Sequence, residues 1–343
     1  MYIWQKINCY NIGILLFLLL PFTALAQTDE LKVALNIYPG NVGYYLMQTK
    51  LEKDQPTFLE KRMKETGGKV TIIPAKDYVV SIQAFVGGQY DAISITTTDY
   101  LLMCADVGAK ASFVMITDYS NGNDGIVLPK GWNLNQMKGK TIAGDKLSCM
   151  ELLSQRWLEL NGKPKDYLVF KNHTCEETPQ LFLSTVGTKD AMACLTWNPG
   201  ITRLLETGKA ELVFSTKNTP GEMIDGFAIR SAAIKDREKS IQALMDAYYD
   251  AMAYFTDPKT HDRALQAIAP QWGFSSEEIP LLAKIMDNQF FFTTKEESLS
   301  FMESKQLQRT KNIALDFFKD SKALKSKNPD SLDITLDPQF LKK

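Results

Sequence analysis

The sequence predicts an α/β protein with two lobes, each a mixed and mostly parallel sheet flanked by helices. Short apolar runs typical of strands alternate with segments of helical spacing, and two such series are separated by a stretch of turn formers. The length of 343 residues suits two hydrophobic cores. A hydrophobic content of 45% and a formal charge of −1 exclude a disordered chain. They also leave no excess of positive charge for binding duplex nucleic acid.

The amino end has the pattern of a signal peptide. Lys6 precedes an apolar run at 12–22, and Ala24-Leu25-Ala26 supplies the small residues that a signal peptidase accepts. The alternative is a membrane anchor, but the run is shorter than the ~20 residues that span a bilayer. No cysteine follows the run at the cleavage region, so a lipid anchor is not indicated. We expect cleavage after Ala26 and an exported protein of the periplasm.

The first series of elements follows this leader. The expected strands are 31–37, 69–73 and 91–95, and the expected helices are 42–51 and 79–86. Thr98 is a candidate cap for a helix that begins with Asp99. A helix amino end is therefore expected where the third strand stops.

A polar segment from Asp118 to Asp124 separates the two series and is too long for a tight hairpin. It lies between expected strands at 111–117 and 125–128, and we interpret it as the crossing between lobes. Beyond it, strands are expected at 140–143, 167–170, 192–195 and 212–214. Ser148 with Glu151 has the spacing of a capping box, and helical periodicity continues until Asn161-Gly162.

The chain then returns to the first lobe through a strand expected at 227–229. The segments after it have helical spacing and are 237–255, 262–269, 276–286 and 295–318. The Lys-rich tail beyond Asp320 is expected to wrap loosely over the surface. The predicted organisation is a signal peptide at 1–26, lobe 1 at 27–120 and 221–320, lobe 2 at 121–220, and a surface tail at 321–343.

Four cysteines remain after the leader, namely Cys104, Cys149, Cys175 and Cys194. An exported protein can form disulfides, and the pairing of four cysteines cannot be read from sequence. Buried thiols are the favoured alternative. His173 and Cys175 precede two glutamates in a polar loop, which reads as solvated because no second pair of ligands has metal-site spacing. We expect neither a metal nor a cofactor.

Catalytic patterns are absent from the sequence. It holds 2 histidines, no Gly-x-Ser-x-Gly elbow and no phosphate-cradling loop with its Lys-Ser/Thr pair. The polar and aromatic residues instead gather at the expected carboxyl ends of strands, where open α/β sheets bind ligands. Each of these positions also has a structural explanation, as a cap or as core packing. The sequence therefore predicts a binding protein and not an enzyme.

The candidate ligand-binding residues come from both lobes and from the expected crossing segments. They are Tyr38, Asn41, Tyr44, Tyr78, Thr96, Thr97, Asp99, Asp118, Ser148, Cys149, Glu151, Trp197, Asn198, Glu222 and Asp225. Aromatic faces and carboxylates in this set suit a planar neutral or cationic nitrogen compound. An anion would need Arg, Lys or helix amino ends, and Lys76 and Lys146 are the nearest cations in sequence.

Several motifs resemble a known family. They are the Gly-Gly-Gln-Tyr-Asp core within 78–99, the run 118–127, Lys138-Gly139-Lys140, 195–199 and 220–225. Together they resemble the substrate-binding proteins of nitrate/sulfonate/taurine-type ABC transporters, in particular the branch associated with urea carboxylase. The resemblance covers nearly the whole mature chain. It implies a two-lobed periplasmic-binding-protein fold of the second type, with a ligand in the cleft between the lobes.

The resemblance also implies partners. A member of this family closes its lobes on a small solute and presents it to an ABC permease with its ATPase, and we expect a monomer. The branch is linked to urea-like or guanidine-like compounds. This chain departs from it at 38–44 and 146–151, where ligand contacts are expected. The alternatives are a sulfonate, taurine or nitrate ligand, a periplasmic sensor subunit, and a thiamin-pyrimidine synthase-like enzyme.

Overall fold

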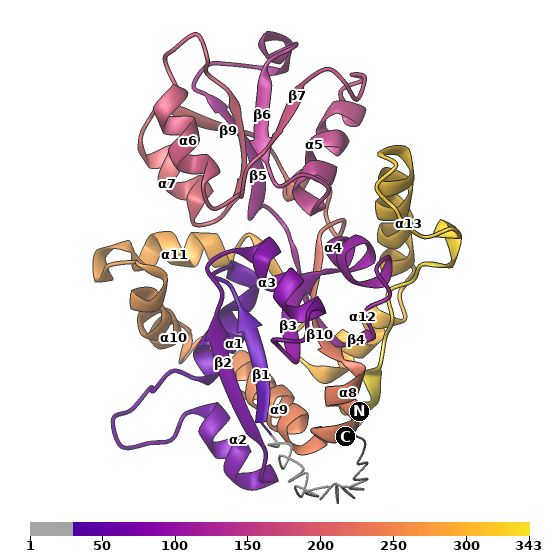
Figure 1. The fold of residues 1–343 in the computed structure, drawn as a ribbon. Helices are drawn as coiled ribbons and strands as arrows, with labels where there is room; N and C mark the ends of the chain where they lie inside the picture. Colours follow the sequence, from indigo (N-terminus) through magenta and orange to yellow (C-terminus); the bar gives the residue numbers. More distant parts are fainter. Residues whose placement is uncertain (1–29) are drawn as a thin grey trace, which may run out of the picture.

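Two twisted sheets organise residues 30–343, the part of the chain that the computed structural model describes (Figure 1). The sheet of lobe 1 has the strand order β11-β4-β10-β3-β1-β2. Its strands are β1 (Glu30–Leu35), β2 (Lys69–Pro74), β3 (Ala92–Thr96), β4 (Ala111–Ser120), β10 (Ile224–Arg230) and β11 (Gln289–Phe291). The sheet of lobe 2 has the order β7-β6-β8-β5-β9. Its strands are β5 (Asp124–Pro129), β6 (Thr141–Gly144), β7 (Val169–Asn172), β8 (Ala193–Trp197) and β9 (Ala210–Ser215).

Both sheets are mixed, and the expectation of mostly parallel pairing was too strong. Strands joined through a helical crossover pair in parallel, namely β1 with β2 and β3, and β6 with β7 and β8. The strands next to the lobe crossings, β4, β5 and β10, pair antiparallel with all their neighbours. The strands by which the chain leaves or enters a lobe are thus added antiparallel to the parallel strands of each sheet.

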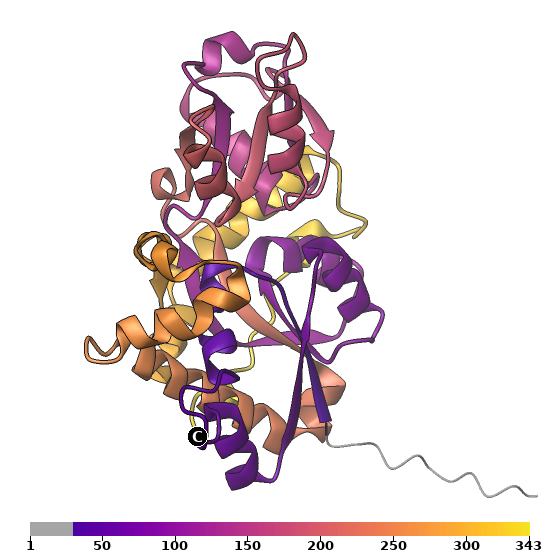
Figure 2. The same cartoon turned by 90° about the vertical axis from the view of Figure 1, so that its left-hand side faces the viewer.

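Helices flank both sheets. Those of lobe 1 are α1 (Val42–Met47), α2 (Phe58–Thr66), α3 (Tyr78–Val86), α4 (Thr97–Tyr100), α8 (Ser231–Asp236), α9 (Glu238–Thr256), α10 (His261–Ile268), α11 (Ile279–Met286), α12 (Lys295–Met302) and α13 (Lys305–Asp320). Those of lobe 2 are α5 (Cys149–Leu160), α6 (Thr178–Thr185) and α7 (Gly200–Glu206). Helix α13 packs against α4 of one lobe and α5 of the other, and Figure 2 shows this C-terminal segment beside both lobes.

Several helices differ from the expected elements. The sequence analysis did not anticipate α2, α6 or α7, and it joined α12 and α13 into one helix. Helix α2 begins with a capping box, in which Thr57 Oγ1 accepts from Glu60 N and Glu60 Oε2 accepts from Thr57 N. The side chain of Ser304 caps α13 at Leu307 N, which separates that helix from α12. These caps were readable signals that apolar periodicity alone did not show.

Two further caps also differ from the prediction. Thr96, and not Thr98, caps α4 by accepting from Asp99 N at 3.0 Å, because β3 runs one residue further than expected. Ser148 caps α5 as predicted, but it accepts from Met150 N and not from the third residue of the helix. Glu151 accepts from Leu147 N, so the pair does not form the reciprocal capping box.

The connection between the sheets is shorter than the polar segment suggested. Strand β4 continues to Ser120 and β5 starts at Asp124, so only 121–123 cross to lobe 2, and 216–223 return. The two crossings are joined. Ser120 Oγ lies 2.6 Å from Thr216 Oγ1, which also accepts from Gly122 N at 2.8 Å. Gly122 has φ 131°, a conformation that glycine tolerates best.

The tail beyond Asp320 packs more tightly than the sequence suggested. Phe113 N donates to Thr335 O, Leu336 forms a bridge with Phe113, and Phe340 is completely buried. The end of the segment is therefore anchored in lobe 1 through Ile334, Phe340 and Leu341, while most of its other side chains stay at least partly exposed. The predicted signal peptide and its cleavage site lie outside the described residues. Within residues 30–343, none of the helices combines the length and the apolar character needed to cross a bilayer.

Candidate functional site

A cavity lies between the two lobes, at the ends of strands from both sheets. The space not filled by atoms amounts to about 350 Å³ and includes some open to solvent. Its lining residues are Asn36, Tyr38, Asn41, Tyr78, Ser94, Thr96, Asp124, Cys149, Trp197, Met223 and Asp225. Strand ends are where α/β sheets offer free backbone groups and loops to a ligand.

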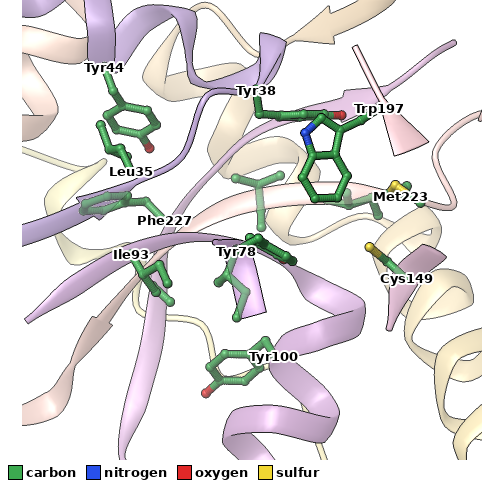
Figure 3. Packing of buried hydrophobic residues seen from close by; sticks show 14 of the residues in the cluster. Leu35, Tyr38, Tyr44, Tyr78, Ile93, Tyr100, Cys149, Trp197, Met223 and Phe227 are labelled. Atoms are coloured by element: carbon green, nitrogen blue, oxygen red, sulfur yellow. The ribbon is translucent and has the colours of Figure 1, made fainter. Parts of the chain in front are cut away.

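Three aromatic side chains dominate the wall of this cavity. Tyr38 follows β1, Tyr78 begins α3, and Trp197 ends β8 in lobe 2. The rings of Tyr78 and Trp197 meet edge to face, with centroids 6.0 Å apart. Figure 3 shows Tyr38 and Trp197 close together with Tyr78 facing them. The aromatic wall is thus formed by both lobes.

The two tyrosines are held by hydrogen bonds from their hydroxyl groups. Tyr38 donates to Asp124 Oδ2 in lobe 2 at 2.9 Å. Tyr78 donates to Asp99 Oδ2 and accepts from Thr96 N, both at 3.0 Å. Because both hydroxyls are committed to partners, the ring faces are the surfaces that remain for a ligand.

Four aspartates surround the cavity. Asp124 and Asp225 line it, and Asp99 and Asp118 lie directly behind the lining, with exposed fractions between 0% and 6% for all four. None of the described residues lining the cavity is Lys, Arg or His. The site therefore concentrates negative charge without a positive neighbour.

Burial raises the pKa of each carboxyl group of this cluster. The pKa of Asp118 and that of Asp124 are raised to about 6. The pKa of Asp225 is raised well above its ordinary value, first by burial and then by the charges of the neighbouring aspartates. Hydrogen bonds from Cys149 and Tyr78 partly offset the effect of burial on the pKa of Asp99. Burial makes ionisation of these carboxyl groups unfavourable, and a cation bound beside them would stabilise the ionised form.

The lobes also contact each other directly around the cavity. Asp99 Oδ1, from lobe 1, accepts from Cys149 N at the start of α5 at 2.7 Å. Tyr78 N donates to Glu176 Oε1 of lobe 2 at 3.1 Å. Together with the bond between Tyr38 and Asp124, these contacts hold the two walls in a closed arrangement.

Seven of the fifteen predicted residues line the cavity. They are Tyr38, Asn41, Tyr78, Thr96, Cys149, Trp197 and Asp225. Asp99 and Asp118 support them from behind: Asp99 through Tyr78, and Asp118 through its neighbour Asp225 on β10. The structure thus gathers these nine residues around one cavity, and their role in ligand binding stays a prediction.

The other six predicted residues do not line the cavity. Tyr44 packs on Phe227 and Tyr248, because the helical turn of α1 rotates its ring into the core of lobe 1 (Figure 3). Thr97 is buried within α4. Ser148 and Glu151 are used at the start of α5, where they accept from Met150 N and Leu147 N.

Asn198 and Glu222 hold other parts of the structure together. Asn198 Nδ2 donates to Asn123 Oδ1 at 2.9 Å, which fixes the first crossing to the end of β8. Glu222 pairs with the guanidinium of Arg156, at 2.7 Å from Nε and 3.0 Å from Nη2. Both side chains are thus occupied by structural partners.

The sequence analysis missed four lining residues, Asn36, Ser94, Asp124 and Met223. Asn36 directly follows β1, and Asp124 belongs to the polar segment already assigned to the crossing, so both had a readable signal. It also missed Gln289 on β11. The Gln289 amide accepts from Asn123 Nδ2 through Oε1 at 2.7 Å and donates to Asp118 Oδ1 through Nε2. No local sequence pattern indicated this residue.

The cysteines and histidines of residues 30–343 can be placed relative to the cavity. Within residues 30–343 the four cysteines are free and buried, as favoured above. His261 Nδ1 contacts Phe255 O, and neither His261 nor His173 is among the lining residues. The described part of the chain holds no group of three or more His, Cys, Asp or Glu side chains suited to a metal ion.

Comparisons with known proteins identify the fold. No family model and no curated protein sequence matches the chain. The periplasmic aliphatic sulphonate-binding protein of Escherichia coli superposes with TM-score 0.68 at 16% identity, over 89% of this chain and 95% of that one. The alkanesulfonate-binding protein of Xanthomonas axonopodis pv. citri, bound to MOPS, gives 0.68 at 15% identity, over 88% and 96%.

A third similar structure is the periplasmic nitrate-binding protein of Synechocystis PCC 6803. It superposes with TM-score 0.58 at 12% identity, over 90% of this chain and 99% of that chain. Likeness at this level of identity concerns the fold. The chain therefore has the two-lobed fold of periplasmic binding proteins of the second type.

Proposed function

We propose that this protein captures a small nitrogen compound, neutral or cationic, in its inter-lobe cavity. The supporting observation is the composition of the cavity wall: three aromatic rings and two lining carboxylates, with two more carboxylates behind them and no basic residue. A planar nitrogen solute can donate hydrogen bonds to the carboxylates while its face rests on a ring.

The same wall disfavours an anionic ligand. The similar structures include binding proteins for sulphonates and nitrate, and such anions need positive or N–H donor partners. Here the first backbone N–H of α5, that of Cys149, is already used by Asp99. An anion would face Asp124 and Asp225 with no counter-charge among the lining residues.

The fold and the expected export extend this proposal to a role in transport. A periplasmic binding protein whose lobes close on its solute delivers it to an ABC permease by hinge motion. We propose the same role for this chain, acting as a monomer in the periplasm, and we propose binding without turnover. Incubation with candidate solutes followed by analysis for products tests the absence of turnover.

A thermal-shift screen tests the ligand class. The panel contains guanidinium, urea, short amides, taurine, alkanesulfonates, nitrate and thiamin precursors. A solute at ~100 times its Kd stabilises the folded protein by ~2.7 kcal/mol if it binds only that form. We expect stabilisation by a nitrogen compound, lost in Asp225→Asn and kept in Asp54→Asn, an exposed aspartate of the same lobe. Stabilisation by nitrate or a sulfonate alone would contradict the proposal.

A further inference from the structure

Two aspartates of the cavity face each other on neighbouring strands. Asp118 on β4 and Asp225 on β10 are paired residues in the antiparallel register, with exposed fractions of 0% and 6%. Both strands lead into the lobe crossings, so the pair lies at the point where lobe 1 meets the cavity. Asp225 lines the cavity, and Asp118 is behind it.

Each member of this pair has a carboxyl oxygen without a hydrogen-bond partner. Asp118 Oδ1 accepts from Gln289 Nε2, but neither Asp118 Oδ2 nor Asp225 Oδ2 has a hydrogen-bond partner within residues 30–343. Buried acceptors are normally satisfied, so two unsatisfied oxygens on adjacent strands call for an explanation. A proton held between the two carboxyl groups satisfies both, because one becomes a donor and the other accepts.

Asp118 has no room to move away from its neighbour. A Cβ placed on Gly40 would lie 2.5 Å from Asp118 Oδ1, so the backbone after Tyr38 presses directly on this carboxyl group. Gln289 fixes the same oxygen from β11. The carboxyl pair is therefore held together by the fold.

The groups around the pair add no positive charge. From lobe 1 it faces Tyr38, Tyr44 of α1, Tyr78 of α3, Asp99 of α4 and Tyr248 of α9, and from lobe 2 it faces Asp124 of β5 and Cys149 of α5. These acidic and neutral neighbours disfavour a second negative charge on the Asp118–Asp225 pair. Burial and the charge of Asp118 both raise the pKa of Asp225, in agreement with the geometry.

Resting on the proposed function, we propose that Asp118 and Asp225 share one proton in the unliganded protein, and that an organic cation releases this proton when it binds. The proton passes to bulk water, and the ligand keeps its own charge. The cation then provides the positive charge that the pair lacks. A neutral solute of the same shape provides none and leaves the proton in place. The pair thus selects for charge and couples capture to pH.

The coupling has a definite sign. At a pH where the pair holds its proton, the cation competes with that proton, so each unit of acidification weakens cation binding by up to tenfold. At a pH above the apparent pKa of the pair, the affinity does not depend on pH. A neutral ligand shows no such dependence through these two groups.

The first experiment needs no ligand. NMR of protein labelled with ¹³C at the Asp carboxyl carbons is recorded from pH 4 to 9. Among the aspartates that titrate above the ordinary range, we expect one titration to disappear in Asp225→Asn, whose amide can still donate to Asp118. The same titration should remain in Asp124→Asn and Asp145→Asn, which remove two other aspartates with a raised pKa. The exposed Asp54→Asn is the matched control and should leave it unchanged. Ordinary titration of all aspartates, or raised titrations that are all unaffected by Asp225→Asn, would overturn the shared proton.

The second experiment uses an isosteric pair, guanidinium chloride and urea, together with tetramethylammonium and calcium chlorides. Calorimetry at one acidic pH in buffers of different ionisation enthalpy measures proton release. We expect guanidinium or tetramethylammonium to release up to one proton, and Asp225→Asn to release none. Binding of an organic cation without proton release, equal binding of urea and guanidinium, or tighter binding of Ca²⁺ would overturn the displacement.

The two experiments separate this inference from the proposed function. If a sulfonate or nitrate binds and the organic cations do not, both the proposed function and the displacement are wrong, while the titration still decides the shared proton. If an organic cation binds with no change in protonation, the proposed function stands and the displacement is wrong.

Discussion

The two lobes contribute different chemistry to the cavity between them. Lobe 1 supplies Asp225 at the wall, with Asp99 and Asp118 behind it. Lobe 2 supplies the indole of Trp197 and a single lining carboxylate, Asp124, which already accepts from Tyr38. From this comparison we propose that lobe 1 recognises the charge of the solute and that lobe 2 closes over it.

The largest expected effect is on lobe 1. Asp225→Asn removes the lining carboxylate that has an unpartnered oxygen, and we expect binding of an organic cation to weaken by about 2–5 kcal/mol, roughly 30-fold or more. Isothermal titration calorimetry measures it. An equal loss in Asp124→Asn would show that the two lobes share charge recognition, and would break the comparison.

A pH effect on stability is expected to be nearly as large, and it tests the lobe 2 carboxylate. Asp124 has a pKa raised from 3.8 to about 6, so the folded protein keeps a proton that the unfolded chain has lost between these values. The free energy of unfolding therefore falls as pH rises through that window, by about 3 kcal/mol for this group. Denaturant unfolding of the protein and of Asp124→Asn from pH 4 to 7 measures the difference. Parallel curves would contradict the prediction.

Removal of the aromatic ring from lobe 2 is expected to have a smaller effect. Trp197→Leu keeps an apolar side chain but deletes the ring that meets Tyr78 at the cavity wall, so cation binding should weaken by about 1–2 kcal/mol. If lobe 2 acts as a lid, the loss should appear in the dissociation rate, which stopped-flow fluorescence measures. A loss confined to the association rate would argue against a lid.

The smallest expected effect concerns a contact between the lobes. Asp99→Asn replaces a charged acceptor by a neutral one at Cys149 N, and we expect closure to weaken by about 1 kcal/mol. Small-angle scattering with and without a bound solute should show a larger open population than in the parent protein. An unchanged scattering profile would show that this hydrogen bond does not set the balance between open and closed forms.

Much of the sheet architecture could be predicted from local pattern. The strands β1, β2, β3, β6, β8 and β10 lie within about three residues of the apolar runs that predicted them, because buried strands need continuous apolar residues. Helix α2 was missed because it buries only Leu59, which leaves little periodicity to detect. Strand β11 was missed because three residues at a sheet edge have no pattern of their own.

The candidate site was predictable where residues follow strands. Tyr38, Thr96 and Trp197 were expected there and line the cavity. From the sequence alone, Tyr44 could not be distinguished from these lining residues. Its packing on Phe227 depends on how α1 meets the sheet. Gln289 reaches Asp118 from a part of the chain 171 residues away, and only the folded structure brings them together.

The joined crossings have a mechanical consequence. Ser120 and Thr216 fasten the outgoing and returning chain segments to each other, and Gly122 N is bonded to the same hydroxyl. Because the two crossing segments are bonded to each other at one point, that point can act as a hinge. The lobes can rotate about it but cannot easily slide past each other. Relative movement of the two halves should accordingly follow a single arc, so that one pair of distance labels is enough to track it.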